Sequence, residues 1–277
     1  AHWVHRIQSN GAINSLQLYT GTPKDEHNTA AFRIRERDLL LAYGGHNHPF
    51  HYVQKVTKDL SASSFKKDIY TEAGMNNASY AQLHEVNGRV YDFTRWNKGA
   101  WWLTWSDDGG ENWSMGVNLV QRGSDAPPGN LYLMSQTLAN GFIRCLIYQH
   151  PLGALENNRL YTLEINSSTG GVTSGGVPLG NLFSNWPSAG YNIQLLTTLY
   201  TPPAGQTFRL LDMAGEGSTI HALIAEIAIG EDGVGYESGS YVYLKTDAGT
   251  LSTEQVSITS HGRDHGYPSY FGGAYFA

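Results

Sequence analysis

The sequence predicts an all-β protein built from four-stranded antiparallel sheets, and three observations lead to that prediction. The chain of 277 residues is poor in charged residues (15%) and rich in glycine (32) and tyrosine (17), which is typical of strands joined by tight turns. Short alternating or apolar runs recur along the chain in place of amphipathic helical patterns. Gly, Asn, Asp and Pro separate these runs and mark the turns between them.

The runs group into four units of about 50 residues, each with four predicted strands. The units begin at the runs "HNTAAFRI", "SYAQLHEV", "LYLMSQTL" and "TFRLLDMA". In the third unit the fourth strand is expected in "NIQLLTTLYT", after a long loop. Four-stranded units that repeat at this period are typical of β-propeller blades, so we predict a β-propeller.

A second signature supports the propeller prediction. The segment "SDDGGENW", residues 106–113, fits the pattern S-x-D-x-G-x-x-W of the Asp box found in sialidase-like propellers. In such a box Asp108 and Gly110 are expected to shape a hairpin turn, and Trp113 is expected to pack between blades. This motif is structural and predicts no chemistry.

The number of blades stays open at this stage. We predict one domain, residues 1–277, with four full blades, and "YPSYFGGAYFA" at the C-terminus reads as the first strand of a fifth. The N-terminal runs "HWVHRIQ" and "SLQLYTG" would complete that blade in a five-bladed closure; alternatively, the chain is part of a larger propeller. No run of 18 apolar residues occurs, so no membrane-spanning helix is predicted.

The single cysteine, Cys145, excludes an internal disulfide framework. It lies within the apolar run "GFIRCLIY", which predicts a buried, unreactive thiol.

Histidines concentrate around the first predicted hairpin. A turn at Arg37–Asp38 would place His27 opposite His48, whereas a turn at Glu36–Arg37 would place it opposite His46. In either register two histidines meet at the open end of the hairpin. Their spacing lacks the usual zinc-binding pattern, and exposed histidines without a shared role remain an alternative.

The next hairpin carries a second candidate pair. The dipeptide Asn87–Gly88 between alternating runs is a strong signal for a two-residue turn. In that register Tyr80 and Arg95 face each other across the two strands. The arginine charge would favour the phenolate form of Tyr80, or the guanidinium would simply pack on the ring.

The order of these residues resembles a known family. The pattern "D-x-H-N-…-L-x-x-x-Y-G-G-H-x-x-P-…-Y", then "S-Y-x-Q-L-…-G-R-V-Y-…-R-W" and "Y-x-H-P", resembles the β-propeller polysaccharide lyases, above all the propeller-type ulvan lyases. The resemblance covers roughly residues 25–165. It implies a seven-bladed propeller with its site at the central groove, and this chain accounts for about five blades.

The resemblance also implies the site residues and their roles. The catalytic positions are His27, His48, Tyr80 and Arg95. The implied substrate-binding positions are Asn28, His46, Asn47, Tyr132 and His150. No catalytic metal and no other cofactor for catalysis is implied, although a structural calcium or zinc ion is compatible with the family.

The implied activity is β-elimination in a polysaccharide that contains uronic acid, most simply ulvan. Arg95 suits neutralisation of the substrate carboxylate, and His27 or Tyr80 suits abstraction of the C5 proton. The expected partner is therefore an anionic polysaccharide, with no nucleic acid and no membrane, for a monomer that is secreted or periplasmic.

Two other functions are compatible with the sequence. The segment "FRIR", residues 32–35, resembles the F-R-I-P element of sialidases, which would indicate a glycoside hydrolase. A carbohydrate-binding propeller without catalysis would need "WNKGAWWLTW" as a stacking platform for sugars. Alternate aromatic residues on the third strand of a blade are, however, expected to be buried between blades.

Overall fold

The structure is a computed structural model. It describes residues 2–19, 30–44, 51–61, 63–68, 78–96, 99–123, 130–149, 158–229, 236–247 and 250–259. The chain forms two compact units, one made of Ala1–Val120 with Ser188–Gly190 and the other of Gln121–Pro187 with Tyr191–Ala277. The single domain expected over residues 1–277 stays a prediction.

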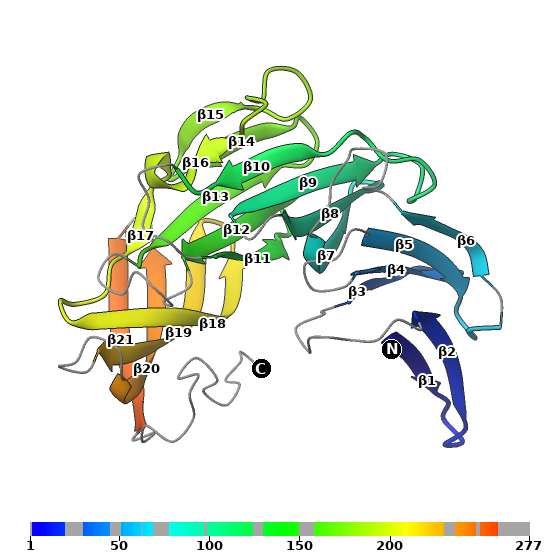
Figure 1. Ribbon diagram of the computed structural model, residues 1–277, viewed down its shortest axis with the longest axis horizontal. Coiled ribbons are helices and arrows are strands. Elements are labelled where there is room, and N and C mark those ends of the chain that lie inside the picture. Colours follow the sequence, from blue (N-terminus) through cyan, green and yellow to red (C-terminus); the bar gives the residue numbers. More distant parts are fainter. Residues whose placement is uncertain are drawn as a thin grey trace. The chain divides into compact units, whose positions relative to one another are not determined.

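The first ten strands begin in the first unit (Figure 1). They are β1 (His2–Ile7), β2 (Ile13–Tyr19), β3 (Ala31–Ile34), β4 (Asp38–Gly44), β5 (His51–Thr57), β6 (Ser63–Asp68), β7 (Ala78–Val86), β8 (Arg89–Trp96), β9 (Ala100–Ser106) and β10 (Val117–Gln121). Strands β1 and β2 form a hairpin, β3–β6 form a four-stranded sheet in chain order, and β7–β10 follow one another in a second sheet.

The second unit contains the remaining elements. They are β11 (Leu131–Thr137), β12 (Phe142–Gln149), β13 (Leu160–Asn166), β14 (Gly171–Ser174), β15 (Val177–Asn181), β16 (Tyr191–Asn192), the 3-10 helix Ile193–Leu195, β17 (Thr198–Tyr200), β18 (Gln206–Glu216), β19 (Thr219–Ile229), β20 (Tyr236–Asp247) and β21 (Thr250–Thr259). That 3-10 turn is the only helix in the ranges given above. No helix there is long and apolar enough to cross a membrane.

The blade formed by β3–β6 settles the register of its first hairpin. Ile34 pairs with Leu39, and the Arg35 N–H donates to the Asp38 carbonyl at 2.9 Å. The turn is therefore Glu36–Arg37, the second of the two turns that the sequence allows. Strand β4 is apolar almost throughout because both of its faces are covered.

The two blades of the first unit share a core, the inter-blade cluster of Leu40, Ala42, Val53, Ala81, Leu83 and Val90. The first three come from β4 and β5, and the last three come from β7 and β8. Trp113 of the Asp box packs against this cluster, as predicted. The opposite face of the first blade packs on the β1–β2 hairpin through Leu41 and Tyr43, which contact Leu18.

In the second unit the third blade differs from the prediction. Strand β17 does pair with β13, through Leu160 and Tyr200, so the predicted strand exists. The preceding segment was expected to be a long loop, which is wrong, because it forms the β14–β15 hairpin and β14 pairs with the other half of β13. Gly175 and Gly176 form the turn between β14 and β15, and both have positive φ angles.

The fourth blade matches its prediction strand for strand. Strands β18–β21 form a four-stranded antiparallel sheet in chain order. Its apolar face, including Phe208 and Ile224, packs on Leu146 and Leu160 of the third blade. The single thiol, Cys145, is fully buried, and burial raises its pKa.

The all-β fold of four-stranded antiparallel blades is thus confirmed. The predicted N-terminal strands are present as the β1–β2 hairpin. The segment "YPSYFGGAYFA", residues 267–277, lies outside the described residues, and the number of blades in a closed ring stays a prediction.

Candidate active site

Tyr80 and Arg95 lie together, but the predicted register between them is wrong. The pairing set by the Asn87–Gly88 turn holds as far as Gln82, which faces Phe93. The register then shifts by one residue, and Ser79, not Tyr80, pairs with Arg95. A β-bulge at Tyr80 causes this shift, and Tyr80 adopts a left-handed backbone with φ of 64°.

The bulge nevertheless brings the two side chains into contact. The Arg95 guanidinium carbon lies 4.6 Å from the centroid of the Tyr80 ring, a cation–π geometry. On the same ring Trp101 stacks at a centroid distance of 6.2 Å and an interplanar angle of 13°. Arg95 and Trp101 are almost fully buried, whereas Tyr80 is half-buried.

Two backbone carbonyls of the bulge are held from the neighbouring strand. The Thr94 hydroxyl lies 2.9 Å from the Tyr80 carbonyl oxygen and 3.1 Å from that of Ser79. Thr94 is fully buried and precedes Arg95 on β8. The Thr94 hydroxyl therefore stabilises the β-bulge of β7 at a position adjacent to Arg95.

A buried ion pair in the same unit was not predicted. His51 Nε2 lies 2.6 Å from Asp92 Oδ2, and neither side chain has exposed surface. Burial raises the pKa of the Asp92 carboxyl, and the adjacent His51 opposes that rise. The available signal was an aspartate within the apolar strand "RVYDFTRW", which requires a buried partner.

A second buried histidine is kept neutral. Arg33 Nη2 lies 3.3 Å from His84 Nδ1, and the His84 and Phe93 rings meet edge to face. Burial, and then the charge of Arg33, lower the pKa of His84 to about 3. His84 therefore offers a neutral imidazole at neutral pH, and its nitrogen accepts from the Arg33 guanidinium.

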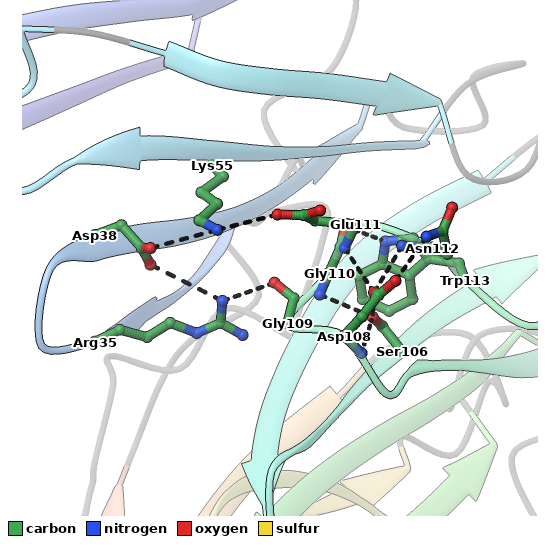
Figure 2. Close-up of polar contacts among 10 residues, drawn as sticks. All are labelled: Arg35, Asp38, Lys55, Ser106, Asp108, Gly109, Gly110, Glu111, Asn112 and Trp113. Atoms are coloured by element: carbon green, nitrogen blue, oxygen red, sulfur yellow. Dashed lines mark hydrogen bonds and ion pairs between the residues drawn. The ribbon is translucent and has the colours of Figure 1, made fainter.

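The Asp box has the structural role that its sequence predicts (Figure 2). The Asp108 carboxylate accepts hydrogen bonds from the backbone N–H groups of Glu111 and Asn112. The backbone and side-chain hydrogen bonds from Asn112, followed by that from the Ser106 hydroxyl, lower the pKa of Asp108 to about 2. The Trp113 indole N–H donates to the Gly110 carbonyl at 2.8 Å, which closes the turn.

The same turn is tied to the preceding blade by charged side chains, also drawn in Figure 2. Arg35 donates to the Gly109 carbonyl at 2.7 Å and, from its Nε, to Glu85 at 2.8 Å. Lys55 lies 3.5 Å from Glu111. Arg35, which stands where the sialidase element has proline, therefore links two blades.

The tryptophan-rich segment contributes one ring to the core, because Trp101 is 1% exposed. Trp96, Trp102 and Trp105 are half-buried. Trp96 and Trp102 meet edge to face at 5.2 Å between ring centroids.

Most predicted site residues lie outside the described residues. These are His27, Asn28, His46, Asn47, His48 and His150. Tyr132 is described: it is half-buried, and its ring centroid lies 5.7 Å from that of Tyr148 in the core of the second unit. The convergence of the two histidines with Tyr80 and Arg95 stays a prediction.

Within the described residues no three His, Cys, Asp or Glu side chains gather in a way that could hold a metal ion. Residues 45–50, which include His46 and His48, lie outside the described residues.

Comparisons with known proteins agree with this fold. A family model described as "BNR repeat-containing family member" matches residues 4–194. A solved PL25 ulvan lyase is similar with a TM-score of 0.63 and 15% identity over 88% of this chain and 61% of that chain. A search of curated proteins returns no match.

Two further solved structures show the same similarity. One is a PL25 ulvan lyase bound to -[GlcA(1-4)Rha3S]-, with a TM-score of 0.63 and 14% identity over 88% of this chain and 61% of that chain. The other is the polysaccharide lyase Uly1, with a TM-score of 0.59 and 12% identity over 91% of this chain and 67% of that one. The chain therefore spans about 61% of the length of the two PL25 structures.

Proposed function

The chain belongs to the BNR repeat-containing family, and from this premise we propose that it is a polysaccharide lyase. Its proposed substrate is an anionic polysaccharide that contains uronic acid, with ulvan as the first candidate. The fold supports this proposal, since the similar solved structures include an ulvan lyase bound to a -[GlcA(1-4)Rha3S]- fragment.

The observation that carries the proposal is the contact between Arg95 and Tyr80. Elimination next to a carboxylate needs a cation to offset the negative charge that develops on that carboxylate. It also needs a proton-transferring group within reach of the same sugar. Arg95 supplies the charge and Tyr80 the hydroxyl, and their side chains are in direct contact.

The proposed reaction proceeds as a β-elimination. A base takes the proton from C5 of the uronate, and the electron pair of that C–H bond forms the C4–C5 double bond. The C4–O bond to the preceding sugar breaks, and the leaving oxygen receives a proton. His27 or Tyr80 acts as the base, Tyr80 is suited to act as the acid, and Arg95 with His48 neutralises the carboxylate.

Further residues are proposed to bind the polymer. They are Asn28, His46, Asn47, Tyr132 and His150. The reaction as written requires no redox group and no cofactor, and a structural calcium or zinc ion would be compatible with it. Because the proposed substrate is a polymer, we place the protein outside the cytoplasm, as a secreted or periplasmic monomer.

The test is to incubate the protein with ulvan and with other uronate polymers and to follow ultraviolet absorbance of the unsaturated uronate. A lyase produces this absorbance together with new reducing ends. A sialidase-like hydrolase would produce saturated sugars without it, and a carbohydrate-binding propeller would retain the polymer without product. Either of the last two results overturns the proposal.

A further inference from the structure

Tyr80 has a backbone conformation that its residue type disfavours. Within the described residues three non-glycine residues have positive φ: Leu60, Tyr80 and Asn87. Leu60 and Asn87 lie in turns, whereas Tyr80 lies inside β7. A bulky aromatic residue in the left-handed region persists only where its surroundings hold it there.

The hydroxyl of Thr94 is well placed to hold it. It lies within hydrogen-bonding distance of two consecutive carbonyl oxygens, those of Ser79 and Tyr80, which belong to the two peptide units that flank the Tyr80 Cα. A valine at position 94 would have nearly the same shape and an equal preference for a strand. The hydroxyl is therefore dispensable for the strand and specific to the bulge.

The left-handed backbone of Tyr80 in this bulge determines where the Tyr80 ring lies. In a regular β7 the Tyr80 backbone would pair with Arg95. In the bulge Ser79 takes that place, and the Tyr80 ring contacts both the Arg95 guanidinium and Trp101. Thr94 thus acts on the ring through the backbone, without contact to a substrate.

We propose that Thr94 is a positioning residue: its hydroxyl holds the β7 bulge in the conformation that places the Tyr80 phenol beside Arg95. This inference rests on the proposed function, in which Tyr80 transfers a proton. It adds a residue to the site that does not itself take part in the chemistry.

The kinetic test compares Thr94→Val with Thr94→Ser. Valine keeps the shape and removes the hydroxyl, whereas serine keeps the hydroxyl. We expect Thr94→Val to lower kcat by about 10-fold or more with little change in KM, because a small misplacement of a reacting group is costly. We expect Thr94→Ser to restore most of that loss.

A double variant separates positioning from a general loss of structure. In the Tyr80→Phe background Thr94→Val should cause no further loss, because the two changes remove the same contribution. If the kcat losses of Tyr80→Phe and Thr94→Val multiply in the double variant, the inference is overturned. A wild-type kcat for Thr94→Val, or equal kcat losses for Thr94→Ser and Thr94→Val, would also overturn it.

A measurement independent of activity keeps this inference distinct from the proposed function. The ring resonances of Tyr80, assigned by their absence in Tyr80→Phe, should carry the shift caused by stacking on Trp101. Thr94→Val should abolish that shift and Thr94→Ser should retain it. Absence of lyase product with the wild-type protein would overturn the function, whereas an unchanged Tyr80 resonance in Thr94→Val would overturn the role of Thr94.

A matched control exists in the same blade. The Thr104 hydroxyl is also buried and donates to a backbone carbonyl, that of Ser114, at 2.8 Å. It belongs to the Asp-box turn and not to the bulge. Thr104→Val should therefore remove a comparable hydrogen bond while leaving the Tyr80 resonance and kcat unchanged, and an equal effect of both valine variants would count against the inference.

Discussion

His51 of β5 and Asp92 of β8 form an ion pair with 2.6 Å between Nε2 and Oδ2, although both side chains are completely buried. The two strands belong to consecutive blades, so the pair joins them inside their shared core. An isolated buried polar side chain would be very costly, and each of these two is tolerated because the other is its hydrogen-bond partner.

Replacement of only His51 or only Asp92 should therefore reduce the free energy of unfolding more than replacement of both. We expect Asp92→Val alone to reduce the free energy of unfolding by about 3–5 kcal/mol. The double variant His51→Leu/Asp92→Val should be more stable than Asp92→Val, because no buried polar group is left uncompensated. Urea unfolding of the wild type, both single variants and the double variant measures this. Additive losses would show that the pair is not coupled.

Tyr80→Phe tests the catalytic role of the phenol. The change keeps the ring that contacts Arg95 and Trp101 and removes only the hydroxyl. If Tyr80 transfers a proton, kcat should fall by about 10²-fold or more while substrate binding persists. Steady-state formation of unsaturated uronate measures both quantities. If Tyr80→Phe had a kcat close to that of the wild type, Tyr80 would not transfer a proton, and His27 and His48 would act as the acid and the base.

Arg95→Lys tests the role of the guanidinium in the same assay. Lysine keeps the positive charge and loses the planar fork that holds a carboxylate through two hydrogen bonds. We expect a large loss of kcat/KM, by about 10²-fold. Arg37→Lys, an exposed arginine in the β3–β4 turn, is the matched control and should leave kcat/KM unchanged.

His84 should make the folded protein less stable in mild acid. Its pKa is lowered from 6.5 to about 3 in the folded state, so between those pH values only the unfolded chain takes up the proton. The contribution of His84 to stability is complete above about pH 6.5 and decreases as the pH falls, by about 1.4 kcal/mol per pH unit. Denaturant unfolding at pH 4 to 7 should show this slope, and His84→Leu should lack it.

Arg144 should contribute strongly to the stability of the second unit. It is 2% exposed, its Nε donates to Glu164 at 2.7 Å, and its two terminal nitrogens donate to the carbonyls of Gly217 and Thr219. Lysine cannot make three such bonds in these directions, so Arg144→Lys should lower the free energy of unfolding by about 2–4 kcal/mol. Arg37→Lys should change it by less than about 0.5 kcal/mol in the same urea titration.

Much of the fold could be predicted because it is encoded locally. Alternation of apolar residues identified the strands of all four blades except the β14–β15 hairpin of the third, and Asn87–Gly88 set the register of the β7–β8 hairpin as far as Gln82. The Asp box gave the contacts of Asp108 and Trp113 correctly. Each of these features depends on residues a few positions apart, whose spacing translates directly into a face or a turn.

The candidate site was predicted less completely. The β7–β8 hairpin predicted that Tyr80 and Arg95 lie close together. It did not predict the β-bulge at Tyr80, because no glycine marks a left-handed position there. The pairing of His51 with Asp92 was also missed, since 41 residues separate them and no local pattern relates their strands.

The sequence by itself therefore determined most of the strands, their turns and the faces that they bury, but not the β14–β15 hairpin. Only the tertiary structure decided that Ser79 rather than Tyr80 pairs with Arg95, and that His51 meets Asp92. The physical reason is that side-chain periodicity and turn chemistry act over a few residues, whereas a strained bulge and a buried ion pair exist only when neighbouring strands and blades pack around them.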